Sequence, residues 1–120
     1  MKQLICVSRA ASGSWQAVPL GAACIASALK ADPRLTGRVA VSLADFGFRD
    51  DAAFIADDLA SRPDAAGAVF FFSVYVWNRS VLSDTARILR SRLPDAVFVA
   101  GGPEVTGNPA GLESSFDYLV

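Results

Sequence analysis

The stretch AVFFFSVYVWNRSVLSDTARILRSRLPDAVFVA, from Ala68 to Ala100, decides the fold. Its two ends, Ala68–Phe72 and Ala96–Ala100, are apolar at nearly every position, which is typical of parallel strands covered on both faces. The segment between them, Arg79–Leu93, carries an apolar stripe at helical spacing. The stripe consists of Leu82, Ala86, Leu89 and Leu93. A strand, a helix and a second strand in this order predict a parallel β-α-β unit.

The same alternation continues toward both ends of the chain. Further apolar runs lie at Leu4–Val7, Val39–Leu43 and Tyr118–Val120, and helical patterns lie at Val18–Ala31 and Asp50–Arg62. In the second helical pattern the apolar positions are Phe54, Ile55 and Leu59. We therefore expect an α/β domain of the flavodoxin-like, or Rossmann-like, kind. It would be a doubly wound, five-stranded parallel sheet with strand order 2-1-3-4-5.

The last connection of this sheet is short. The polar stretch Asn108–Ser115 separates the fourth and fifth strands, so we expect at most a short helix there. The chain then ends on a strand with no helix after it, whereas parallel sheets normally bury both faces. We expect residues 1–120 to be a single domain from the N-terminal part of a longer polypeptide.

The composition disfavours several classes of partner. The 120 residues include 11 basic and 12 acidic side chains and no histidine, a balance without the electrostatic footprint of a nucleic-acid or membrane binder. No apolar segment is long enough for a signal peptide or a membrane span. Cys6 and Cys24 lie in apolar patterns that indicate two buried thiols. We expect a soluble, cytoplasmic protein that binds neither nucleic acid nor membrane.

Three loops follow strands whose carboxyl ends meet at one edge, where open α/β sheets bind ligands. They span residues 8–15, 73–78 and 101–107. The first has neither the clustered carboxylates of a phosphate-acceptor domain nor the closely spaced glycines of a dinucleotide fold. Without histidine there is no Ser-His or Cys-His pair. Five aspartates fit loop, cap or solvated positions, namely Asp45, Asp50, Asp51, Asp57 and Asp58. We expect binding rather than catalysis.

Each candidate binding residue also has a structural interpretation. Gly101 and Gly102 would let a ligand lie against the backbone, but a tight turn before Pro103 uses the same residues. The Ser73 hydroxyl would bond either a ligand or the local backbone. The rings of Tyr75 and Trp77 suit a pocket wall, core packing or a subunit contact. The residues alone leave these alternatives open.

Taken together, the loops resemble the cobalamin-binding domain at the N-terminus of B12-binding radical-SAM proteins. The resemblance covers nearly the whole chain and is carried by Val18–Gly21, Ser73–Asn78 and Gly101–Thr106. It implies that Ser73 meets the displaced nucleotide base of the corrinoid, and that Gly101 and Gly102 line the nucleotide tail.

The first loop departs from the pattern of this family. B12 domains of the methionine-synthase type have Asp-x-His-x-x-Gly there. In this chain Gly13 matches, Ser8 replaces the aspartate and Ala10 stands at the position of the cobalt-ligating histidine. The resemblance thus implies cobalamin held without a metal ligand from this domain. The implied cofactor-binding residues are Ser8, Arg9, Gly13, Ser73, Val74, Tyr75, Trp77, Asn78, Gly101, Gly102, Pro103, Glu104 and Thr106.

The resemblance also implies partners for the domain. A radical-SAM domain downstream in the same chain would carry an iron–sulfur cluster and S-adenosylmethionine and perform the reaction, so the full-length protein would be an enzyme of the methyltransferase-like or a related kind. One alternative is a B12-binding fold without cofactor that serves as a docking or dimerisation platform, which leaves a homodimer open. Another is a flavodoxin-like module that binds a flavin or a small anion through the loop after the first strand.

Overall fold

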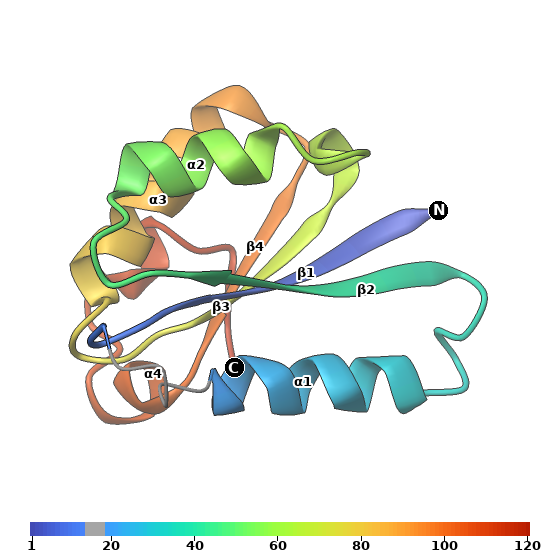
Figure 1. Ribbon diagram of the computed structural model, residues 1–120, viewed down its shortest axis with the longest axis horizontal. Coiled ribbons are helices and arrows are strands. Elements are labelled where there is room, and N and C mark those ends of the chain that lie inside the picture. Colours follow the sequence, from blue (N-terminus) through green and yellow to red (C-terminus); the bar gives the residue numbers. More distant parts are fainter. Residues whose placement is uncertain (14–18) are drawn as a thin grey trace.

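The computed structural model describes residues 1–13 and 19–120 and contains one five-stranded parallel sheet in the order β2-β1-β3-β4-β5 (Figure 1). The strands are β1 (Lys2–Arg9), β2 (Val39–Phe46), β3 (Val69–Ser73), β4 (Val97–Gly101) and β5 (Tyr118–Leu119). The helices are α1 (Leu20–Ala31), α2 (Ala52–Ala60), α3 (Arg79–Arg92) and α4 (Pro103–Gly107), with short 3-10 helices η1 (Ala65–Gly67) and η2 (Leu112–Ser114). The strand order and the alternation with helices confirm the predicted flavodoxin-like α/β fold.

Several element boundaries differ from the prediction; α2, for example, is shorter at both ends than the predicted segment Asp50–Arg62. Strands β1 and β2 are longer than their apolar runs, because the parallel ladder continues as far as the pair Arg9 and Phe46. The loop predicted at 101–107 contains the short helix α4, which begins at Pro103, a residue suited to a first helical turn. The predicted start of the first helix, Val18, lies outside the described residues.

Helices α2 and α3 cover one face of the sheet and build the main core (Figure 1). Alternate residues of β3 and β4 point into this core, where the rings of Phe70 and Phe98 stack with their centroids 5.7 Å apart. The predicted stripe of α3 is fully buried, from Leu82 to Leu93. In α2, Ile55 and Leu59 are buried but Phe54 is 55% exposed, so that part of the predicted apolar face is wrong.

Helix α1 covers the opposite face through a smaller core (Figure 1). Its residues Ala22 and Ala26 pack on Cys6 of β1, and this burial raises the pKa of the Cys6 thiol to about 11. Cys24 lies on the other side of α1 and is exposed. The prediction of two buried thiols is therefore right for Cys6 and wrong for Cys24, because α1 packs on the sheet through Ala22, Ala26, Ile25 and Leu29 and not through the side that carries Cys24.

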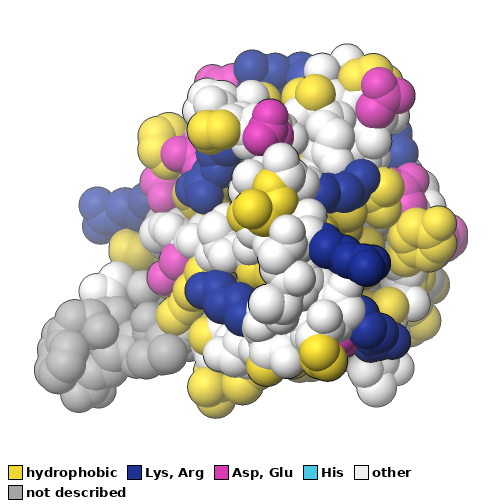
Figure 2. All heavy atoms as spheres, turned by 90° about the vertical axis from the view of Figure 1, so that its right-hand side faces the viewer, with side chains coloured by type: hydrophobic (Ala, Val, Ile, Leu, Met, Phe, Trp, Pro, Cys, Tyr) yellow, Lys and Arg dark blue, Asp and Glu magenta, His cyan; other side chains and the backbone are white. Residues whose placement is uncertain are grey.

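The molecular surface at the amino ends of the strands carries both signs of charge, interspersed with apolar side chains (Figure 2). This mixture agrees with the near balance of 11 basic and 12 acidic residues. In the described part of the chain, no helix combines the length and apolarity needed to cross a bilayer.

Gly102 lets the ends of β3 and β4 approach each other closely. Its φ of 106° is unfavourable for residues with a side chain, and a Cβ there would lie 2.7 Å from the Val74 carbonyl oxygen. That carbonyl accepts a hydrogen bond from the Glu104 N–H at 3.3 Å, and the Val74 N–H donates to the Gly101 carbonyl at 2.8 Å. The turn thus explains Gly102 without a ligand.

We predict that Gly102→Ala lowers the free energy of unfolding by roughly 2 kcal/mol or more, because it combines positive φ with a backbone clash. Denaturant unfolding followed by circular dichroism measures the loss. Gly107→Ala is the matched control, since a Cβ at Gly107 meets nothing within 4 Å. It should change stability by no more than about 0.5 kcal/mol. Equal stability of the two variants would contradict this account.

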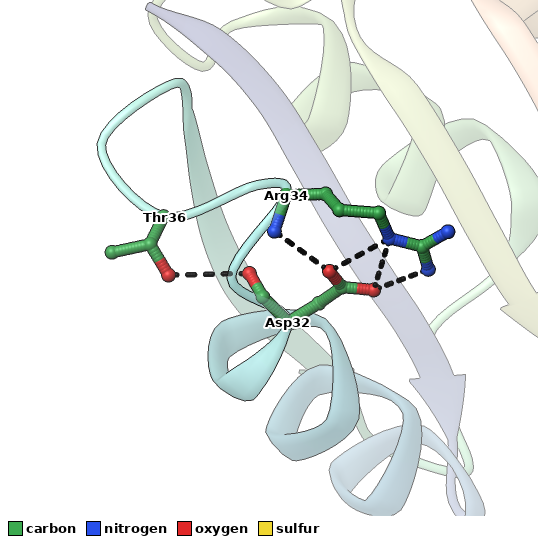
Figure 3. A network of polar contacts seen from close by, with 3 residues as sticks. All are labelled: Asp32, Arg34 and Thr36. Atoms are coloured by element: carbon green, nitrogen blue, oxygen red, sulfur yellow. Dashed lines mark hydrogen bonds and ion pairs between the residues drawn. The ribbon is translucent and has the colours of Figure 1, made fainter.

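The connection after α1 is held by the carboxylate of Asp32 (Figure 3). Asp32 accepts hydrogen bonds from the backbone N–H of Arg34 at 2.8 Å and from its guanidinium at 2.6 Å, while its own carbonyl accepts from the Thr36 hydroxyl at 3.2 Å. The hydrogen bonds from Arg34 lower the pKa of Asp32 from 3.8 to about 2.

We predict that Arg34→Gln moves the pKa of Asp32 back toward 3.8, as measured by NMR titration of its carboxyl carbon. Because folding lowers this pKa, the stabilisation is complete above pH 3.8 and is lost as the pH falls toward about 2. Arg38→Gln should leave the titration unchanged, as the Arg38 side chain makes no contact with Asp32 among the hydrogen bonds of the described chain. The same pKa in wild type and Arg34→Gln would refute the role of the guanidinium.

Candidate functional site

Polar side chains lie at the carboxyl ends of three neighbouring strands, on the face of the sheet that α1 covers. Ser8 of β1 pairs with Asp45 of β2, and its hydroxyl donates to Asp45 Oδ1 at 2.7 Å. Ser73 ends β3, one step beyond the register pair Val7 and Phe72. Since Val7 and Phe72 point into the core under α2 and α3, strand alternation turns Ser8 and Ser73 toward α1.

A pocket of about 280 Å³ lies between this row and the first turn of α1. Residues of β1 and its loop, including Ala10 and Ala11, form one wall, and Leu20 and Gly21 of α1 form another. The sheet order reverses here, because β2 lies on one side of β1 and β3 on the other. This is the switch point at which open α/β sheets bind their ligands.

Two hydroxyl groups converge in this pocket beside Gly21. A Cβ at Gly21 would lie 2.7 Å from Tyr75 Oη and 3.0 Å from Ser73 Oγ. Ser73 is only 4% exposed, and within the described chain neither hydroxyl makes a hydrogen bond to another residue. A mostly apolar pocket with a few convergent polar groups is the usual form of a small-molecule site.

The rim of the pocket is aromatic. The rings of Tyr75 and Trp77 stack with their centroids 4.5 Å apart and an interplanar angle of 10°. Trp77 is 49% exposed, and the neighbouring Val76 is 75% exposed. The loop after β3 therefore presents apolar surface beside the two hydroxyls.

Asn78 and Arg9 hold the loops around the pocket in place. Asn78 is 1% exposed and bridges the ends of β1 and β3, because its amide donates to the carbonyls of Ser73 at 3.2 Å and Arg9 at 3.4 Å. Its Oδ1 accepts from the Tyr75 N–H at 2.8 Å. The Arg9 guanidinium donates to the carbonyls of Asp50 and Phe48. The Asn78 amide and the Arg9 guanidinium therefore both make hydrogen bonds that hold the loops together.

The pocket thus brings together six of the residues that the sequence suggested. They are Ser8, Arg9, Ser73, Tyr75, Trp77 and Asn78. Val74 lies instead in the main core at 0% exposure, and a Cβ at Gly13 would meet the Phe48 ring at 2.9 Å. Trp15 of the first loop lies outside the described residues.

The predicted residues after β4 lie away from the pocket. A Cβ at Gly101 would lie 3.3 Å from Val120 Cγ2, and Gly102 packs on Val74. Glu104 forms an ion pair with Arg79 at 2.7 Å, Pro103 begins α4 and Thr106 is exposed. Their contacts shape the connection between β4 and β5.

Asp45 and Gly21 are among the pocket residues that sequence reasoning did not assign to the site. Asp45 was placed outside the second strand because the apolar run ends at Leu43, whereas β2 continues to Phe46. Extending the strand by its alternation would have put Asp45 beside Ser8. Gly21 could have been noticed in the sequence, because glycine is a poor helix former and yet lies in the first turn of the predicted helix.

No family model matches this chain, and no curated protein matches it in sequence. Across residues 1–13 and 19–120, no three histidine, cysteine or acidic side chains gather as a group suited to a metal ion.

We predict that Asn78→Ala lowers the free energy of unfolding by roughly 2–4 kcal/mol, because it leaves one N–H and two carbonyls around the pocket without their partner. Urea unfolding followed by circular dichroism tests this loss. Asn108→Ala provides the control on an exposed residue and should cost about 0.5 kcal/mol or less. A loss no larger than that of the control would contradict the bridging role.

Proposed function

We propose that this chain is a cobalamin-binding module that takes the nucleotide tail of the corrinoid into the pocket between α1 and the ends of β1 and β3. One observation supports this proposal most directly. Ser73 is 4% exposed, its hydroxyl makes no hydrogen bond to another described residue, and it faces Gly21 of α1 in the pocket. A hydroxyl that lines an apolar pocket and makes no hydrogen bond within the protein can bond a ligand there.

The residues of the pocket fit the base of such a tail. A flat heteroaromatic ring offers nitrogen acceptors to the hydroxyls of Ser73 and Tyr75 and apolar faces to Leu20 and the neighbouring alanines. The volume of about 280 Å³ lies at the small end of ligand pockets. It suits a nucleotide rather than a corrin ring, which would remain outside, beside the exposed Val76 and Trp77.

The proposal relies on a different glycine from those that the resemblance emphasised. Gly101 and Gly102 pack against Val120 and Val74, whereas Gly21 packs directly against the two hydroxyls of the pocket. An alanine at Gly21 would place its methyl carbon 2.7 Å from Tyr75 Oη and 3.0 Å from Ser73 Oγ, too close unless these side chains shift. In this proposal Gly21, from the Val18–Gly21 segment, lets α1 approach the two hydroxyls that bond the base.

The residues of this chain bind and orient the cofactor. When bound, the corrinoid supplies the reactive cobalt–carbon bond. The chain has no histidine to serve as the lower ligand of cobalt, so retention depends on the tail pocket and the aromatic rim. The iron–sulfur cluster and S-adenosylmethionine belong, in this proposal, to a radical-SAM domain of the full-length enzyme.

We predict that the purified protein binds hydroxocobalamin, shifts its absorbance spectrum and retains it on a desalting column. Ser73→Ala should weaken binding about tenfold, because one buried hydrogen bond to the base is lost. Circular dichroism checks that the variant remains folded.

The matched control is Ser91→Ala, on α3 on the other face of the sheet, whose hydroxyl bonds only the Ile88 carbonyl among the described residues. It should bind hydroxocobalamin as the wild type does. A wild-type protein that neither shifts the spectrum nor retains the cofactor would overturn cobalamin binding. Equal affinity of Ser73→Ala and wild type would overturn the placement of the tail.

A further inference from the structure

The pocket contains a carboxylate with an unused oxygen. Asp45 Oδ1 accepts the hydrogen bond from Ser8, whereas Oδ2 has no partner in the described chain. The Asp45 side chain lines the pocket and is exposed, so its second oxygen is accessible to a bound molecule. An ionised carboxylate only accepts hydrogen bonds and therefore selects a donor.

The position of Asp45 sets the distance between this acceptor and the hydroxyls. Asp45 and Ser8 each lie one residue before the end of their strand, and Ser73 ends β3. The backbones at Asp45 and Ser73 are therefore two strand spacings apart, roughly 10 Å. This separation matches the span from the far edge of a nucleoside base to the hydroxyls of its ribose. A base beside Ser73 and Tyr75 would therefore bring its sugar to Asp45.

We infer that Asp45 and Ser8 form a subsite for a ribose hydroxyl, and that the pocket selects ribonucleosides and ribonucleotides. The inference rests on the proposed function in using the same pocket, and the ribonucleotide tail of cobalamin is one member of this ligand class. An acidic side chain near the end of the second strand recognises ribose in dinucleotide-binding folds for the same chemical reason.

Ser8 has two roles in this arrangement. Its hydroxyl donates to Asp45 Oδ1 at 2.7 Å, which fixes the carboxylate and turns Oδ2 to the ligand. Because a hydroxyl also accepts hydrogen bonds, Ser8 can receive one from the same sugar. The Arg9 guanidinium, which also lines the pocket, donates to two backbone carbonyls rather than to Asp45. A sugar phosphorylated at the recognised hydroxyl would be repelled.

The subsite is tested by calorimetric titration with adenosine and 2′-deoxyadenosine. Wild-type protein should bind adenosine about tenfold more tightly, because a hydrogen bond to a charged acceptor is lost with the deoxy sugar. Asp45→Ala should abolish this preference. Asp57→Ala, which removes an exposed carboxylate from α2, should preserve it. Equal affinity for the two nucleosides in the wild type, or an unchanged preference in Asp45→Ala, would overturn the inference.

Titrations with hydroxocobalamin and with cobinamide, a corrinoid without the nucleotide, separate this inference from the proposed function. Preference for adenosine without hydroxocobalamin binding would support the ribose subsite and overturn cobalamin as the ligand. Binding of hydroxocobalamin that is unaffected by Asp45→Ala would overturn the subsite and leave cobalamin binding intact. Equal affinity for cobinamide and hydroxocobalamin would overturn the tail placement, whereas the adenosine preference and its loss in Asp45→Ala decide the subsite.

Discussion

The register of the central strand β1 is the constraint on which the site depends. β1 pairs in parallel with β2 on one side and β3 on the other, and side chains alternate between the two faces. With Val7 fixed in the main core, Ser8 must point toward α1, beside the ends of β2 and β3. A slip of one residue would exchange these two side chains, burying a hydroxyl in the core and removing the polar row.

Two glycines bring backbone elements together for different purposes. Gly102 stands against the Val74 backbone with positive φ, so its lack of a side chain serves the joining of β3 to β4. Gly21 stands against the ends of two side chains, Tyr75 and Ser73, in a helix where glycine is less stable than alanine. A Cβ there would lie too close to both hydroxyls, so the absence of a side chain at Gly21 allows α1 to pack against the residues that line the pocket.

Much of the fold followed from the sequence because buried parallel strands and one amphipathic helix, α3, carry strong patterns. Those patterns stop where the apolar runs stop, so the polar ends of β1 and β2, including Asp45, were missed although they continue the ladder. Gly101 and Gly102 have the same local sequence signal whether they line a ligand or close a turn. Only the packing of Val120 and Val74 against them distinguishes the two. Ser73 was identifiable because it ends a buried strand.

The first loop differs from the B12 family pattern at two positions, and one of them, Ser8, is hydrogen-bonded to Asp45. In that pattern an aspartate ends the first strand and a histidine follows it, whereas this chain has Ser8 and Ala10. A carboxylate is nevertheless present one strand away, joined to Ser8 by a 2.7 Å hydrogen bond. In the described chain the second oxygen of that carboxylate makes no hydrogen bond. In the proposed site this oxygen would accept from a sugar hydroxyl while the hydroxyls of Ser73 and Tyr75 bond the base, so Ser8, a residue that differs from the B12 pattern, is one through which the proposed pocket would hold the ribose.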